Sequence, residues 1–187
     1  MNLLILGPPG TGKRFWLKKL IKFWLKNIDD RVLYAAVDVP PDEIDYKGII
    51  VDCYSERVGR SEQKYYATCA YDLDEIYKEV TLAIDEFDGK YLVIDSLTPL
   101  ILTLGSPSVY RFLQKLLAYA KINQINVISI LHQGAHDERE ERSILHLFDD
   151  ALILEKLNNK RKIEYYYHRK HDSEKKRYHI KKGEIIE

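Results

Sequence analysis

Two kinds of hydrophobic pattern alternate along this chain. Short apolar runs, with the length and composition of buried parallel strands, lie at 2–6, 31–37, 48–53, 90–95 and 125–131. Between most of them, apolar residues recur at three- and four-residue spacing, and this predicts amphipathic helices over 12–26, 73–87, 97–104 and 109–122. Strands that alternate with helices predict an α/β fold, with a mostly parallel central sheet and helices on both of its faces.

The remaining segments complete this picture. Pro40 and Pro41 end the second strand, and a turn of helix is expected over 42–46. The polar stretch 55–68 is expected to be a loop, and the charged segment 133–147 to be irregular. A strand at 151–154 is followed by period-2 patterns at 161–168 and 176–181, which predict a C-terminal antiparallel hairpin. We expect all of these elements to form a single domain, residues 1–187.

The turn after the first strand has a composition suited to binding phosphate. It reads Gly7-Pro8-Pro9-Gly10-Thr11-Gly12-Lys13, which matches the first seven positions of the G-x-x-x-x-G-K-[ST] loop between a strand and a helix. Glycines allow the backbone to curve so that successive N–H groups face an anion, and the helix N-terminus adds positive potential. We therefore expect this loop, with Arg14 and Phe15 after it, to bind a nucleoside triphosphate, most simply ATP.

The eighth position of the motif departs from the pattern, because Arg14 replaces the usual Ser or Thr. That hydroxyl normally ligates Mg²⁺, whereas a guanidinium is always protonated and has no lone pair to offer. Asp95, at the end of the apolar run Tyr91–Ile94, is the candidate acidic residue for Mg²⁺. The alternative is that Asp95 caps the next helix, a role for which Ser96 competes. We hypothesise that Arg14 supplies positive charge to the phosphates and so partly replaces the Mg²⁺ ion.

Composition and charge exclude several other classes of protein. Hydrophobic residues make up 45% and charged residues 31% of the chain, which indicates a soluble globular protein, and no apolar run reaches the ~18–20 residues of a membrane span. The two cysteines, Cys53 and Cys69, have no metal-binding spacing. We expect a cytoplasmic location. Residues 156–187 hold 11 basic and 5 acidic residues, a net charge of +6, so this segment suits either an anionic partner or a solvated hairpin.

Taken together, the motifs resemble those of the KaiC-like branch of RecA-type ATPases over nearly the whole length. Beyond the phosphate loop, the resemblance rests on segments 34–44, 51–59, 91–105, 131–138, 145–155 and 179–186. The run Ile94–Ile101 (IDSLTPLI), followed by HQG-x-HDE and LHLFDDALILE, is more specific than the loop, which many families share.

The resemblance implies a RecA-type core that binds ATP at subunit interfaces, in a homo-oligomer or with related subunits. It also implies catalytic roles. Such proteins usually carry two glutamates that activate water after the second strand, and here those places hold Asp38 and Val39. Gln133 matches a glutamine that senses the γ-phosphate, and Arg169 matches loosely a basic residue that reaches a neighbour's ATP.

Three functions follow from these observations. A positioned base contributes roughly 10²–10⁴-fold to such reactions, so the loss of one carboxylate and of the metal hydroxyl predicts a nucleotide-binding regulator or scaffold with slow or absent hydrolysis. The second is an active ATPase in which Asp38 suffices. The third is a DNA-binding recombinase paralogue, which is disfavoured because acidic residues outnumber basic ones in 134–147 and because no DNA-binding module precedes Gly7.

Overall fold

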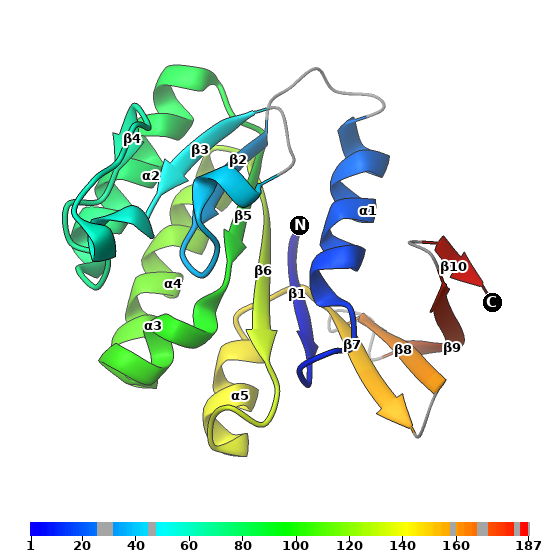
Figure 1. Cartoon of the computed structure of the whole chain (residues 1–187). Helices are drawn as coiled ribbons and strands as arrows, with labels where there is room; N and C mark the ends of the chain where they lie inside the picture. Colours follow the sequence, from blue (N-terminus) through cyan, green and yellow to red (C-terminus); the bar gives the residue numbers. More distant parts are fainter. Residues whose placement is uncertain (26–31, 45–47, 158–159, 168–171, 182–183, 187) are drawn as a thin grey trace.

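The computed structural model describes residues 1–25, 32–44, 48–157, 160–167, 172–181 and 184–186. Their strands form one ten-stranded sheet in the order β10-β9-β8-β7-β1-β6-β5-β2-β3-β4 (Figure 1). Seven of these strands pair in parallel, namely β1 (Asn2–Gly7), β2 (Val32–Ala36), β3 (Ile49–Asp52), β4 (Tyr65–Tyr66), β5 (Tyr91–Asp95), β6 (Asn126–His132) and β7 (Asp150–Leu157).

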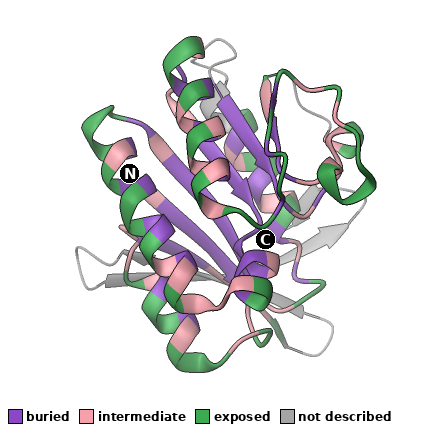
Figure 2. Cartoon of the chain, turned by 90° about the vertical axis from the view of Figure 1, so that its left-hand side faces the viewer, coloured by how far each residue is buried: buried purple, intermediate pink, exposed green. Residues whose placement is uncertain are grey.

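Helices cover both faces of this sheet, as the hydrophobic pattern predicts. One face carries α1 (Lys13–Leu25), whose Leu17 and Ile21 are buried against β1, β2, β5, β6 and β7. The other face carries α2 (Leu73–Phe87), α3 (Leu97–Leu104), α4 (Ser106–Ile122) and α5 (Glu138–Leu145). Strand residues alternate between the two layers because successive side chains of a strand point to opposite faces. Figure 2 shows the result, with buried strands between helices that expose their outer sides.

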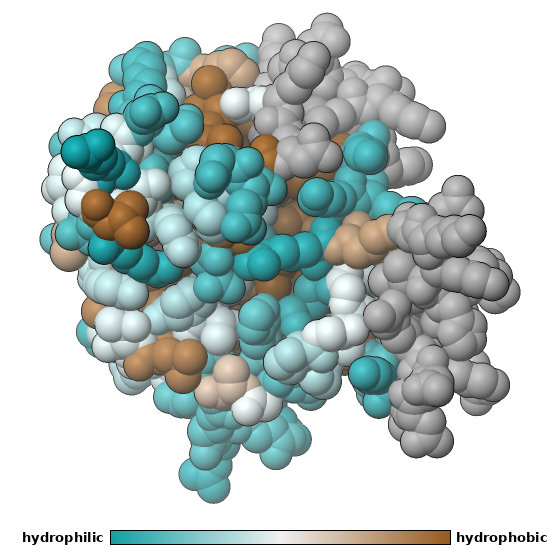
Figure 3. Space-filling model, viewed as in Figure 1, coloured by the Kyte–Doolittle hydropathy of each residue, from teal (hydrophilic) through white to brown (hydrophobic). Residues whose placement is uncertain are grey.

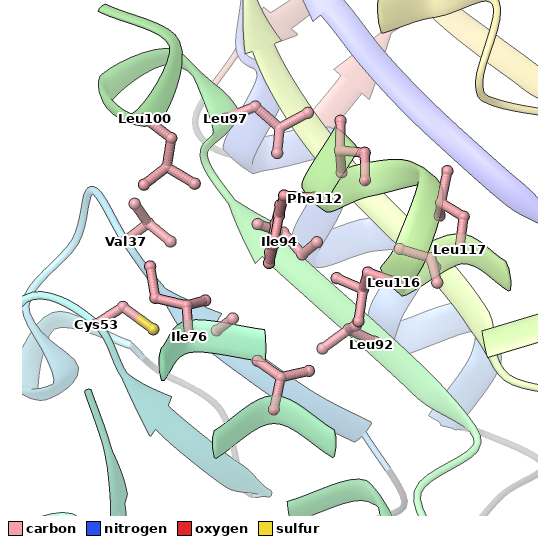
Figure 4. Packing of buried hydrophobic residues seen from close by; sticks show 14 of the residues in the cluster. Val37, Cys53, Ile76, Leu92, Ile94, Leu97, Leu100, Phe112, Leu116 and Leu117 are labelled. Carbon is pink, nitrogen blue, oxygen red and sulfur yellow. The ribbon is translucent and has the colours of Figure 1, made fainter. Parts of the chain in front are cut away.

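The larger of the two cores lies beneath α2, α3 and α4. Figure 4 shows Leu92 and Ile94 of β5 packed against Phe112 and Leu116 of α4. All four side chains are 6% exposed or less. Burial of a large apolar side chain contributes about 1.5–3 kcal/mol, so this layer fixes β5 and the residue that ends it, Asp95.

Two segments differ from what the sequence pattern predicts, and a third agrees with it in part. The stretch 55–68 contains a short 3₁₀ helix (Ser55–Val58) and β4, which extends the parallel sheet beside β3. Another 3₁₀ helix, Pro41–Glu43, lies at the start of the turn expected over 42–46, of which residues 45 and 46 lie outside the described residues. Helix α4 begins at Ser106 instead of 109, since Pro107 lies in its first turn, where its missing N–H costs nothing.

The prediction that 133–147 is irregular is wrong. Helix α5 (Glu138–Leu145) forms there, and Asp137 and Glu140 cap it reciprocally: the Asp137 side chain accepts from backbone N–H groups at the helix start, and Glu140 accepts from the N–H of Asp137. The high density of charge concealed this spacing.

The C-terminal extension is larger than a hairpin. Strands β8 (Lys160–Tyr167), β9 (Asp172–Lys181) and β10 (Glu184–Ile186) follow β7, and each pairs antiparallel with the strand before it. The extension therefore adds three strands to the β7 edge of the sheet. The front of the molecule beside it is mostly hydrophilic, with isolated apolar patches (Figure 3).

Candidate nucleotide site

The carboxyl ends of four neighbouring parallel strands bring the predicted site residues together. Strands β1, β6, β5 and β2 are adjacent in the sheet and end at Gly7, His132, Asp95 and Ala36, respectively. The register pairs Gly7 with His132 and Ala36 with Asp95. Ligands of open α/β sheets bind at this edge of the strands. Residues as far apart in the sequence as Gly7 and His132, 125 positions, thus meet around the N-terminus of α1.

The phosphate loop connects β1 to α1 and is held in shape by its own residues. Gly10 and Gly12 have φ values of 77° and 87°, a region that favours glycine. The Thr11 hydroxyl donates to the carbonyl oxygen of Pro8 at 2.8 Å. A Cβ at Gly7 would lie 2.5 Å from the carbonyl oxygen of Leu154 in β7, so this position requires glycine.

The side chain of Lys13 folds back onto the phosphate loop. Its Nζ donates to the carbonyl oxygens of Gly7 at 2.6 Å and of Pro8 at 2.8 Å, and the residue is only 6% exposed. Burial, with a smaller contribution from the adjacent charge of Arg14, lowers the pKa of Lys13 to about 8, against an opposing effect of Asp95. A phosphate group that replaced the two carbonyl contacts would find an ammonium group already positioned in the loop.

Arg14 lies between the two carboxylates that the sequence assigns to catalysis and metal binding. Its Nε donates to Oδ2 of Asp95 at 2.9 Å, and its Nη2 donates to Oδ2 of Asp38 at 3.3 Å. The Asp95 side chain is fully buried, that of Asp38 is 33% exposed, and that of Arg14 is 49% exposed. Although burial acts in the opposite direction, the two carboxylates raise the pKa of Arg14 above its usual value, so the guanidinium stays charged.

Sequence reasoning missed Tyr34 as a member of this cluster. It lies on β2, two residues from the end of the strand, and its hydroxyl donates to Oδ2 of Asp95 at 2.6 Å. Burial, and then the charge of Asp95, raise the pKa of Tyr34, so the phenol remains a donor. The one signal in the sequence is the hydroxyl of Tyr34 itself, because most positions of a buried strand carry aliphatic side chains and a buried hydroxyl needs a hydrogen-bond partner.

The alternative role of Asp95, as a helix cap, falls to its neighbour. Ser96 is the residue that occupies the N-cap position of α3, although its side chain makes no capping hydrogen bond. The carbonyl oxygen of Asp95 accepts from the backbone N–H groups of Val37 and Asp38, both at 2.9 Å. Asp95 therefore holds the residues that follow β2, including Asp38, next to the phosphate loop.

Gln133 and His132 lie on the other side of the loop. The backbone N–H of Gln133 donates to the carbonyl oxygen of Gly7 at 3.0 Å, which places this residue directly beside the phosphate loop. Burial, followed by the charge of Lys13, lowers the pKa of His132, so this half-buried imidazole is neutral at pH 7. Phe15 is half-buried against Trp16, with ring centroids 6.5 Å apart. Arg169 lies outside the described residues.

These residues do not fit the usual magnesium arrangement. Position 14 offers only N–H donors, and Oδ2 of Asp95 already accepts from both Arg14 and Tyr34. The remaining oxygen, Oδ1, is buried and has no hydrogen-bond partner among the described residues. Within the same part of the chain, no group of three His, Cys, Asp or Glu side chains could hold a metal ion. Mg²⁺ in nucleotide sites usually takes one or two protein oxygens together with phosphates and water. Here position 14 supplies none, and at Asp95 only the buried Oδ1 has no hydrogen bond.

Comparison with known proteins identifies the family of this chain. A family model described as "ATPase: KaiC" matches residues 1–187. The chain belongs to the KaiC ATPase family. UPF0273 protein MK0039 of Methanopyrus kandleri is 26% identical to it over 126 residues, which are 58% of this chain and 49% of that protein. The match thus spans about half the length of this curated relative.

Among solved structures, the KaiC-like protein PH0186 of the hyperthermophilic archaeon Pyrococcus horikoshii OT3 superimposes with a TM-score of 0.75. The match covers 99% of this chain and 88% of that protein at 18% sequence identity. The RecA-type α/β fold that the KaiC-like motifs predict is confirmed by this likeness. None of the helices in the described part of the chain has the length and hydrophobicity to span a membrane.

Proposed function

We propose that this KaiC family member binds ATP at the loop 7–13 and works as a nucleotide-dependent switch or scaffold that hydrolyses ATP slowly or not at all. Membership of the family supports nucleotide binding. The observation that supports weak hydrolysis is the position of Arg14, which engages both Asp38 and Asp95. These are the two carboxylates on which water activation and metal binding would depend.

Binding and hydrolysis make different demands on this site. Binding needs a curved loop that presents its amides to the phosphates, the α1 N-terminus and Lys13, and the positive φ values of Gly10 and Gly12, the start of α1 and the buried Lys13 support it. Hydrolysis also needs a water molecule oriented by a carboxylate that can accept its proton. Oδ2 of Asp38 is paired with Arg14, and Val39, at the place of the second family glutamate, has no carboxylate. The site therefore favours retention of ATP over its turnover.

An active ATPase is the second candidate, because Asp38 is one-third exposed at the mouth of the site and Gln133 lies beside the loop. In that case, one carboxylate would orient the water. Assembly with further copies of this chain, or with related subunits, belongs to either proposal. DNA binding stays the disfavoured candidate, because the segment 134–147 is acidic and its Glu140 and Glu141 serve the fold by accepting from Ser106 and Gly134.

Calorimetric titration with ATP, alongside measurement of phosphate release, tests the proposal. Both are run with and without Mg²⁺ and single-stranded DNA. We expect ATP binding that Lys13→Ala weakens strongly, together with phosphate release at or near the background rate. Magnesium-dependent turnover that disappears in Asp38→Asn would establish the active ATPase instead. Absence of nucleotide uptake at millimolar ATP would refute both.

A further inference from the structure

In this site the positive charge among the acidic groups belongs to an amino-acid side chain, that of Arg14. In the motif, position 14 supplies an oxygen ligand to a divalent ion. Here the Arg14 side chain extends from the first turn of α1 to the position between Oδ2 of Asp95 and Oδ2 of Asp38, which its nitrogens approach at 2.9 and 3.3 Å. A positive charge thus lies where the acidic residues of the site converge.

From this arrangement we propose that Arg14 replaces magnesium, and that the ligand of this site is metal-free ATP. The proposal rests on the proposed function, since it specifies the form of nucleotide that the same loop binds. The proposal goes further than a loss of metal binding, because Arg14 itself neutralises part of the phosphate charge.

The geometry of the guanidinium supports this role. Arginine has five N–H donors, of which Nε–H and one Nη2–H contact the two carboxylates. The other three donors make no hydrogen bond to a described residue, and about half of the side chain is exposed. Because a guanidinium can bind carboxylate and phosphate oxygens at the same time, Arg14 can remain anchored to Asp95 while it faces the phosphates.

The surroundings fix Arg14 in place. Tyr34 donates to the same Asp95 oxygen, so the carboxylate accepts from two sides and cannot turn away from the guanidinium without losing one of them. The carboxylate is also completely buried, and a buried charge requires a partner of opposite sign. Mg²⁺ that approached Oδ2 would have to displace Arg14, which forms the one salt bridge to Asp95 among the described residues, while Oδ1 is buried.

The same geometry disfavours the magnesium complex of ATP. A hydrated Mg²⁺ ion bound to the phosphates would approach the guanidinium, and like charges in a partly buried site repel each other strongly. Free ATP carries more negative charge than its magnesium complex and would gain more from Lys13 and Arg14 together. Magnesium should therefore leave binding unchanged or weaken it.

Calorimetric titration of ATP in EDTA and in excess Mg²⁺ tests the proposal on the full chain. For the wild type, we expect binding in EDTA to be at least as tight as binding in Mg²⁺. For Arg14→Thr, which restores the hydroxyl of the motif, we expect magnesium to tighten binding tenfold or more. Lys18→Thr is the matched control: it removes one exposed positive charge from the next turn of the same helix and should behave as the wild type.

A second measurement does not depend on affinity alone. Mn²⁺, used in place of Mg²⁺, should show no protein-bound signal in electron paramagnetic resonance with wild-type protein and ATP, and a bound signal with Arg14→Thr. Thermal unfolding verifies that the variant is folded. Wild-type binding that is threefold or more tighter with Mg²⁺, or an Arg14→Thr variant that stays metal-independent, would overturn the proposal. Both outcomes leave ATP binding itself intact, whereas absence of any binding would refute the proposed function as well.

Discussion

The buried ammonium group of Lys13 makes ATP binding sensitive to pH in an unusual range. Because burial and Arg14 lower its pKa from 10.5 to about 8, the group is half deprotonated near pH 8, where an exposed lysine is still protonated. Only the protonated form attracts phosphate. The protonated fraction falls from about 0.76 at pH 7.5 to about 0.09 at pH 9, so the association constant for ATP should fall about eightfold over this interval.

Calorimetry can measure this effect in two ways. Titrations in EDTA at pH 7.5, 8.0, 8.5 and 9.0 give the affinity directly. At pH 8, titrations in two buffers with different ionisation enthalpies give the protons taken up, which should be about half a proton per ATP, since a bound phosphate restores the ordinary pKa of Lys13. Lys13→Ala is the control, and it should show weak binding without this uptake. An affinity that stays constant from pH 7.5 to 9, or proton uptake that persists in Lys13→Ala, would refute the reasoning.

The same lysine should affect stability with the opposite sign. Between its native pKa of about 8 and its unfolded value of 10.5, the unfolded chain binds a proton that the native chain does not. The free energy of unfolding should therefore rise with pH across this window, by at most about 3 kcal/mol. Urea unfolding of the wild type and of Lys13→Met, compared at pH 7.5 and 10, isolates this contribution; equal pH dependence of the two proteins would contradict it.

Three further changes test other parts of the structure. Gly7→Ala would place a Cβ 2.5 Å from the Leu154 carbonyl oxygen and should weaken ATP binding tenfold or more in calorimetry. Tyr34→Phe removes a buried donor to Asp95 and should lower the free energy of unfolding in urea by about 1–3 kcal/mol; no loss would show that this hydrogen bond contributes little. Leu113→Ala, in the fully buried layer of α4, should cost about 2–5 kcal/mol in the same assay, whereas Leu102→Ala, at a residue that is 64% exposed, should cost under about 0.5 kcal/mol.

Much of the fold is predictable from local pattern. The phosphate loop, strands β1, β2, β3, β5 and β6, and helices α1, α2 and α3 lie close to where the periodicity of the chain places them. Helix α5 escaped prediction because two-residue features, such as the capping pair Asp137 and Glu140, are weak signals within a charged segment. Strand β4 has only two residues, and it is a strand because β3 lies beside it.

The sequence by itself determined which groups are available at the candidate site: a loop for phosphate, Lys13, an acidic residue at 95 and an arginine in place of a hydroxyl. Only the tertiary structure decided what these groups do to one another. Arg14 and Asp95 are 81 positions apart, and Tyr34 and Asp95 are 61 apart. Their contact depends on β2 lying beside β5, with α1 on the face to which Asp95 points. The order of the strands is set by the packing of the whole sheet, and the local periodicity of the sequence does not determine it.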